Sequence, residues 1–182
     1  MPKTQICLSS QSVTLEQLAI KNFDKAVSFI ESVGIEVRFS GITGKTVLAG
    51  ITIENGAIVV DKEALQCPGD ILHEAGHIAV VPASERATLN TADIGKRRDF
   101  AAEEMMAISW SYAACMHLQL DPSFVFHDEG YKGESAQIIE RFTQGQYLAL
   151  PMLQWVGMAQ ERRSETEPEK PVFPAMLRWL RE

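Results

Sequence analysis

The sequence feature that most constrains this chain is the segment His73-Glu74-Ala75-Gly76-His77, which interrupts an otherwise apolar run. Ile71-Leu72 precede it and Ile78-Ala79-Val80 follow it, and this pattern is typical of a buried helix. Two imidazoles and a carboxylate that were buried without partners would cost several kcal/mol. The segment therefore needs a compensating group, and a metal ion bound by the histidines would satisfy it.

The spacing of the two histidines suits a metal ion. Residues four apart lie on one helix face with Cβ atoms about 5–6 Å apart, so His73 and His77 can both reach Zn²⁺ at about 2.0–2.1 Å. Glu74 would lie beside the ion, where a carboxylate can take a proton from a metal-bound water and pass it to a leaving amine. This H-E-x-x-H spacing predicts a hydrolytic site with one Zn²⁺ per chain and Glu74 as general base.

Two other interpretations of the motif stay open. The histidines could be solvated on a surface helix, or they could hold zinc without catalysis. Gly76 also has two explanations, because a helical glycine costs up to about 1 kcal/mol against alanine. Either another element approaches the helix closely at Gly76, or the helix simply tolerates the glycine.

Zinc needs a third protein ligand and an open position for water. Glu103 and Glu104 begin the longest helical candidate, residues 97–120, which is apolar beyond them and should be central and buried. We favour Glu104, because its helix face continues through small residues that allow close packing against the motif helix: Ala107, Ser111 and Cys115. The alternatives are Glu103, His117, His127, Asp128 and Cys67.

The rest of the chain predicts one α+β domain over residues 1–182, with an N-terminal helix and a short sheet followed by a mostly helical part. Apolar residues at helical spacing predict a helix over residues 14–33 that stops before Gly34. The β-branched runs Thr46–Ile53 and Ala57–Val60 flank Asn55-Gly56, which predicts a hairpin. Further expectations are a strand over 35–39, helices over 71–81 (with Asp70 as N-cap), 134–142, 150–159 and 173–181, a polar loop over 83–96, an irregular loop over 124–133 and an exposed linker over 160–172.

Composition narrows the class of partner. The net charge is −7 with a pI near 5.2, which argues against nucleic acid or an anionic membrane surface. No apolar run approaches the roughly 20 residues that span a bilayer, and the N-terminus lacks the apolar stretch of a signal peptide. The three cysteines, Cys7, Cys67 and Cys115, do not form a disulfide pattern. We therefore expect a cytoplasmic protein, and the sequence leaves its oligomeric state open.

The motif and a glutamate that begins a later helix together resemble the gluzincins, the zincin metallopeptidases whose third zinc ligand is Glu. The order of hairpin, motif helix and Glu-led helix is similar, over about residues 46–120, to the small cytoplasmic metallopeptidases that cleave phage-type repressors. This resemblance implies a zincin-like fold and a peptide or protein substrate. The chain departs from thermolysin-like members because Ile108, and not aspartate, lies four residues after Glu104. A group that orients a zinc-bound histidine must then come from elsewhere.

Two further elements of the site are expected. Tyr131 or His127, in the polar loop, could stabilise the oxyanion of a tetrahedral intermediate. The substrate could lie antiparallel to an exposed edge of the Thr46–Val60 sheet. The function predicted from sequence is thus a zinc metallopeptidase. The alternatives are a zinc-binding regulatory module without catalysis and a zinc hydrolase of a non-peptide amide.

Overall fold

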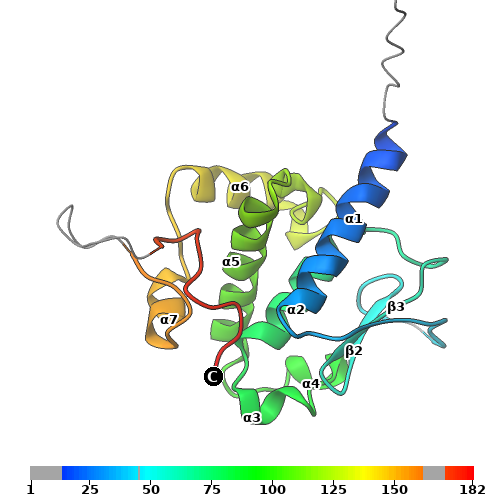
Figure 1. The fold of residues 1–182 in the computed structure, drawn as a ribbon, viewed down its shortest axis with the longest axis horizontal. Coiled ribbons are helices and arrows are strands. Elements are labelled where there is room, and N and C mark those ends of the chain that lie inside the picture. The colour runs from blue at the N-terminus through cyan, green and yellow to red at the C-terminus, as the bar shows by residue number, and fades with distance from the viewer. Residues whose placement is uncertain (1–13, 45, 162–170) are drawn as a thin grey trace, which may run out of the picture.

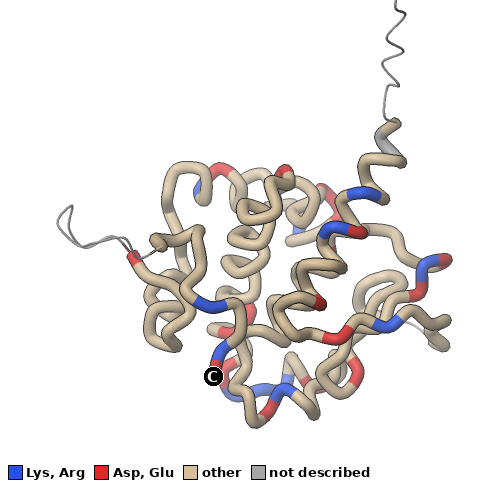
Figure 2. The backbone as a smooth tube through the Cα atoms, in the orientation of Figure 1, with Lys and Arg blue, Asp and Glu red and all other residues tan. Residues whose placement is uncertain are grey.

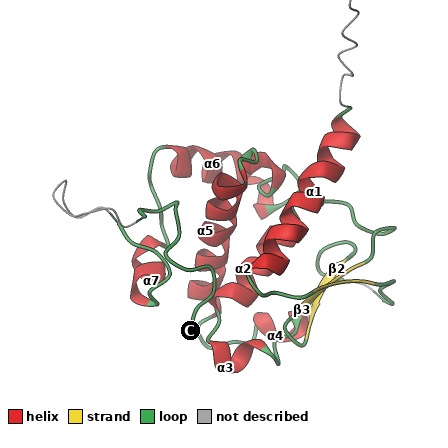
Figure 3. Cartoon of the chain, viewed as in Figure 1, coloured by secondary structure: helices red, strands yellow, loops and turns green. Residues whose placement is uncertain are grey.

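A computed structural model describes residues 14–44, 46–161 and 171–182. In this part of the chain seven α-helices accompany a small three-stranded sheet, so the α+β class is confirmed (Figure 1 and Figure 3). The elements are α1 (Leu15–Ser32), β1 (Val37–Phe39), β2 (Ile51–Glu54), β3 (Ala57–Val60), α2 (Asp70–Val80), α3 (Ala83–Arg86), α4 (Thr91–Ile94), α5 (Phe100–Leu118), α6 (Ser135–Thr143) and α7 (Leu150–Trp155), with 3-10 turns η1 (Pro122–Phe124) and η2 (Tyr131–Gly133).

Helix α1 begins and ends close to the predicted positions. The Thr14 hydroxyl accepts a hydrogen bond from the Gln17 backbone N–H, and the Gln17 side chain accepts one from the Thr14 N–H. This capping box satisfies two amides that the first helical turn leaves unpaired. Gly34 follows the helix with φ of +95°, a conformation that glycine adopts without the steric cost of a side chain.

The sheet has the strand order β1-β3-β2, with β1 parallel and β2 antiparallel to β3. Asn55 and Gly56 have φ of 51° and 76°, which confirms the predicted hairpin turn. The strand expected from Thr46 starts only at Ile51, because residues 46–50 bend away from the ladder and turn at Gly50 (φ +75°).

The outer edge of β2 is already occupied. Its two outward-facing amides, those of Ile51 and Ile53, donate to the Leu48 carbonyl and to the Thr91 hydroxyl, respectively. Strand addition needs free amides along an edge. In the described structure, the edge expected to receive a substrate is therefore closed along β2.

Helices α2 and α5 pack against each other in the middle of the molecule, with the sheet beside α2 (Figure 1). A Cβ on Gly76 would lie 2.8 Å from the Ala107 carbonyl oxygen and 3.1 Å from the Ala107 Cα. The close approach of α5 thus explains the glycine in the motif helix. Ser111 also lies at this contact: its hydroxyl is 2.7 Å from the Ala107 carbonyl oxygen of its own helix and 3.2 Å from the Leu72 carbonyl oxygen of α2.

Near the ends of α2 the structure differs from two predictions made from the sequence. Asp70 is the first residue of the helix and not its N-cap: Gly69 takes that position, and the Asp70 carboxylate turns to His127 at 2.9 Å. Residues 83–96, expected as a polar loop, contain the short helices α3 and α4. In α4, the Thr91 hydroxyl meets the edge of β2, so tertiary contacts support a helix too short to be stable alone.

The prediction of a helix over residues 173–181 is wrong. Residues 171–182 form turns and bends, because their backbone groups bond to other parts of the molecule. The Leu177 N–H donates to the Met158 carbonyl, the Arg181 N–H to the Ala79 carbonyl, and the Trp179 carbonyl accepts from the Trp110 indole. In the predicted linker over 160–172, residues 162–170 lie outside the described residues.

Charges of both signs are interspersed along α1, around β1 and through the α3–α4 region (Figure 2). Among the described helices, none combines the length and the apolarity that crossing a bilayer requires.

Candidate metal centre

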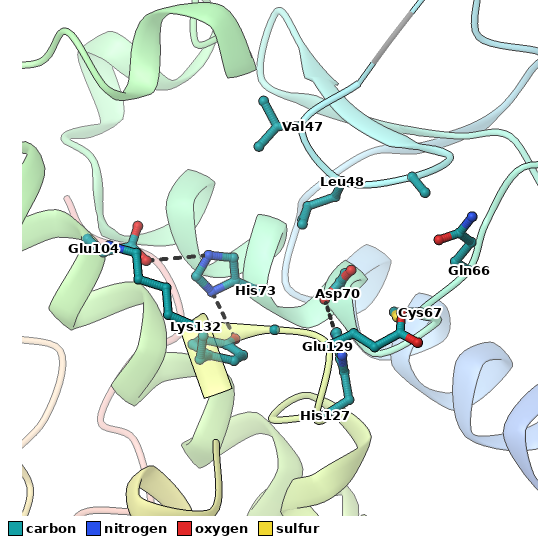
Figure 4. Close-up of a pocket in the computed structure, with 13 residues that line it drawn as sticks. Val47, Leu48, Gln66, Cys67, Asp70, His73, Glu104, His127, Glu129 and Lys132 are labelled. Atoms are coloured by element: carbon teal, nitrogen blue, oxygen red, sulfur yellow. Dashed lines mark hydrogen bonds and ion pairs between the residues drawn. The ribbon is translucent and has the colours of Figure 1, made fainter. Parts of the chain in front are cut away.

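A pocket of about 420 Å³ opens beside α2 (Figure 4). Its walls come from five parts of the chain: the first turns of α2, the start of α5, the Val47–Ala49 segment, Gln66-Cys67 and the loop over 127–132. Glu104 lies at one end of the pocket and Cys67 at the other, with His73 between them (Figure 4). The pocket thus brings together side chains that are far apart in the sequence.

The three favoured metal ligands converge. The Nε2 atoms of His73 and His77 lie 3.1 Å apart, and the Glu104 carboxylate oxygens lie 3.7 Å from His73 Nε2 and 3.4 Å from His77 Nε2. All three ligand atoms fall within 4.8 Å of one another. Atoms about 2.0–2.2 Å from a common Zn²⁺ would have separations of this order.

Burial keeps both imidazoles in the form that binds metals. It lowers the pKa of His73 to about 3, with a further contribution from His77, and it lowers the pKa of His77 to about 4. Both rings are therefore neutral at neutral pH, and a lone pair is available on each. Burial also raises the pKa of the Glu104 carboxyl, a direction that a bound divalent cation would oppose.

Glu74 carries the strongest sign that a further group belongs here. Its side chain is buried, and its Oε2 atom has no hydrogen-bond partner among the described residues. Burial, together with the nearby carboxylates of Asp70 and Glu104, raises the pKa of Glu74 to about 8. A buried acceptor without a donor is costly. A cation with a hydrogen-bonding water would satisfy it, so the residues fit a zinc ion.

Glu103 and Glu104 point to different partners. Glu103 is buried and binds Arg97 through two hydrogen bonds, Nε to Oε2 at 2.5 Å and Nη2 to Oε1 at 2.8 Å. The same Arg97 also binds Glu85 at 2.7 Å, and these bonds raise the pKa of the guanidinium. Glu103 is thus committed to an ion pair, and Glu104 is the glutamate that faces the histidines.

Tyr131 lies behind His73. Its hydroxyl is 3.3 Å from His73 Nδ1, the ring nitrogen on the far side from Glu104. When Nε2 faces a metal, the proton resides on Nδ1 and donates to the tyrosine oxygen, which fixes the tautomer and the ring orientation. Tyr131 therefore has the geometry of the orienting group that α5 does not supply, and the oxyanion role expected for Tyr131 or His127 stays a prediction. Sequence reasoning missed this role, because the two residues are 58 positions apart.

The other candidate ligands lie elsewhere. His117 packs against Phe29 and Trp179 in tilted and edge-to-face contacts, with ring centroids 5.3 Å from each. Asp128 is exposed and does not line the pocket. Cys67 and His127 line the pocket but group with Asp70 and not with His73 and His77.

Comparison of the chain with protein families, with curated proteins and with solved structures gave no match. A functional assignment therefore rests on the residues of the site.

Proposed function

We propose that the chain is a zinc-dependent metallopeptidase of the gluzincin type, in which His73, His77 and Glu104 hold one Zn²⁺. One observation carries the proposal: two neutral imidazoles and a carboxylate converge within 4.8 Å, and the helix of these imidazoles also carries Glu74, whose buried Oε2 has no partner among the described residues. Two solvated histidines on a surface helix would not have this burial or this third partner. A zinc site without catalysis would not need Glu74.

The chemistry follows from these positions. When bound, zinc is a Lewis acid that lowers the pKa of a coordinated water to about 7. Glu74 accepts a proton from the attacking water and later delivers it to the leaving nitrogen of the cleaved amide. Burial raises the pKa of Glu74 in the metal-free chain, and a bound Zn²⁺ would lower it again, which would leave the carboxylate free to accept the proton. Tyr131 holds the His73 ring in place.

The substrate in this proposal is a peptide or protein segment. It lies across the pocket against Val47–Ala49, the part of the predicted hairpin region that lines the pocket. Val47 is 83% exposed and offers an apolar surface to a side chain of the substrate. We assign the protein to the cytoplasm, where reducing conditions suit the free thiols of Cys67 and Cys115.

The test is metal content together with the Glu74→Gln variant. His77→Ala should lose about one zinc per chain relative to wild type. Glu74→Gln should keep the zinc and the fold but lose cleavage of a peptide library followed by mass spectrometry, since it removes only the proton acceptor. Chelation should abolish wild-type cleavage, and added zinc should restore it.

Contrary outcomes separate the alternatives. A zinc-loaded wild type that cleaves no peptide would favour a regulatory module, and cleavage restricted to small non-peptide amides would favour the other hydrolase. Protein that takes up no transition metal after zinc supplementation would refute the proposal. Cleavage by Glu74→Gln at the wild-type rate would remove Glu74 as the base.

A further inference from the structure

Cys67, Asp70 and His127 form a second cluster of metal-binding side chains, at the end of the pocket opposite Glu104 (Figure 4). One ligand atom from each lies within 4.8 Å of the others, and Asp70 Oδ1 is 2.9 Å from His127 Nε2. We propose that this cluster is a second zinc site, separate from the site formed by His73, His77 and Glu104.

The donor set favours zinc. Zn²⁺ binds thiolate, imidazole and carboxylate at about 2.0–2.3 Å, whereas Mg²⁺ and Ca²⁺ prefer oxygen ligands alone. Three protein ligands of these types, with the pocket open to a water, match the coordination number of zinc. The mixed sulfur, nitrogen and oxygen set therefore distinguishes this cluster from a group of surface acids.

Two of the ligands are already held in position. A Cβ on Gly130 would lie 3.2 Å from the His127 ring, so the glycine backbone packs directly against the imidazole. The His127 carbonyl accepts a hydrogen bond of 2.7 Å from the Ser135 hydroxyl. Asp70 is the first residue of α2, with an exposed fraction of 7%, and its carboxylate makes no helix cap. These contacts restrict both side chains before a metal binds, so metal binding would cost little additional side-chain entropy.

Asp70 and His127 are joined through one ring nitrogen, Nε2, while Nδ1 is buried without a hydrogen-bond partner among the described residues, so a single contact holds this pair together. Cys67 lies in a field of negative charge: burial raises the pKa of its thiol, and the carboxylates of Asp70 and Glu129 raise it further. Glu129 lies beside Cys67 at the same end of the pocket (Figure 4). A divalent cation would neutralise this charge.

Binding moves two protons. Zn²⁺ binds the Cys67 sulfur as a thiolate, so the thiol proton leaves to solvent. The proton shared by Asp70 and His127 must also leave the binding atoms, so that Asp70 binds as carboxylate and His127 binds through a ring nitrogen that carries no proton. The ion would join three segments: residues 66–69, the first turn of α2 and the loop over 126–133. That loop carries Tyr131, so the second zinc would brace the wall of the pocket behind His73.

The test uses the full chain loaded with zinc or with cobalt. Wild type dialysed against zinc should hold about two ions per chain, His77→Ala about one and Cys67→Ser about one. Cobalt-loaded wild type should show a thiolate-to-cobalt charge-transfer band, because Cys67 is, among the described residues, the one cysteine in either cluster. The band should persist in His77→Ala, where the first site is lost, and in Cys115→Ala, a control whose thiol is buried elsewhere.

The band should vanish in Cys67→Ser and weaken in Asp70→Asn, a near-isosteric change that keeps the side-chain volume. Circular dichroism checks that each variant is folded. A cobalt protein without the band, or a band that survives Cys67→Ser, would overturn the proposal and leave Asp70 and His127 as a hydrogen-bonded pair only. These outcomes do not depend on catalysis, so they are distinct from a failure of the first site.

Discussion

Glu103 and Glu104 are neighbours in the sequence, and a shift of one position along the helix gives their side chains different partners. Adjacent residues point about 100° apart on a helix, so the two carboxylates cannot face the same partner. Glu103 is buried against Arg97, whereas the half-buried Glu104 faces the histidines. The first contact contributes to folding, and the second, in our proposal, contributes to metal binding.

Replacing each glutamate by alanine should separate these contributions. Glu104→Ala should weaken zinc binding at the first site by at least about tenfold, because a ligand is lost. Glu103→Ala should leave that affinity nearly unchanged but lower the free energy of unfolding by about 1–3 kcal/mol, the usual cost of losing hydrogen bonds to a charged group. Competition with a chelator measures the zinc affinity, and urea denaturation of the metal-free protein measures the stability.

The opposite ranking of zinc affinities would transfer the ligand role to Glu103. Two variants with unchanged affinity at the first site would refute the gluzincin-type ligand set.

At the scale of elements, the spacing between α2 and α5 sets the geometry of the candidate centre. Because Gly76 has no side chain, the backbone of α5 can approach α2 at this position. The α5 residue that lies against Gly76 is Ala107, about one turn after Glu104. A side chain on Gly76 would push the two helices apart and move Glu104 away from His77.

Gly76→Ala should therefore destabilise the protein, although alanine is the better helix former. We expect a loss of about 1–3 kcal/mol in the free energy of unfolding, typical of overpacking in a core, together with weaker zinc binding. Gly95→Ala is the matched control, because its Cβ would meet nothing within 4 Å, and it should change stability by less than about 0.5 kcal/mol. Urea denaturation measures both variants, and equal stabilities for the two would contradict the close-packing argument.

Elements with local signals could be predicted from the sequence, and those that depend on distant contacts could not. The Thr14–Gln17 capping box marks the start of α1, and Asn55-Gly56 marks the hairpin, since each signal acts within a few residues. Helix α4 depends on the contact of Thr91 with β2, which no local pattern reports. Asp70 had the sequence of an N-cap, but the burial of its carboxylate against His127 outweighed that preference.

The same division holds for the site. The spacing of His73 and His77 and the small residues after Glu104 are helix-face patterns, so their convergence could be predicted. The position of Tyr131 behind His73 and the pairing of Asp70 with His127 arise from a loop that folds over the pocket. Periodicity does not encode such a contact.

At the scale of the whole molecule, residues 171–182 complete the core around α5. The Trp179 ring meets Phe29, Trp110 and His117, with centroids 4.8, 5.4 and 5.3 Å away. Phe173, Leu177 and Leu180 had helical spacing, but the segment makes its hydrogen bonds to α2, α5 and Met158.

Trp179→Ala should lower the free energy of unfolding by about 2–4 kcal/mol, because it removes a large ring from an aromatic cluster. Trp155→Ala is the control: its side chain is 89% exposed, and its loss should change stability by less than about 0.5 kcal/mol. Thermal or urea unfolding checks both. Similar stabilities for the two variants would show that residues 171–182 do not support the core.

The hydrogen bonds between residues 171–182 and α2 have a consequence for biosynthesis. The Arg181 backbone bonds to the Ala79 carbonyl and its guanidinium to that of Val80, 101 positions earlier in the chain. Translation proceeds from the N-terminus, at about 5–20 residues per second. The ribosome must therefore extend the chain by about a hundred residues after the motif before the end of that helix can be secured. These two bonds therefore form only after Arg181 has left the exit tunnel, several seconds after the motif has been synthesised.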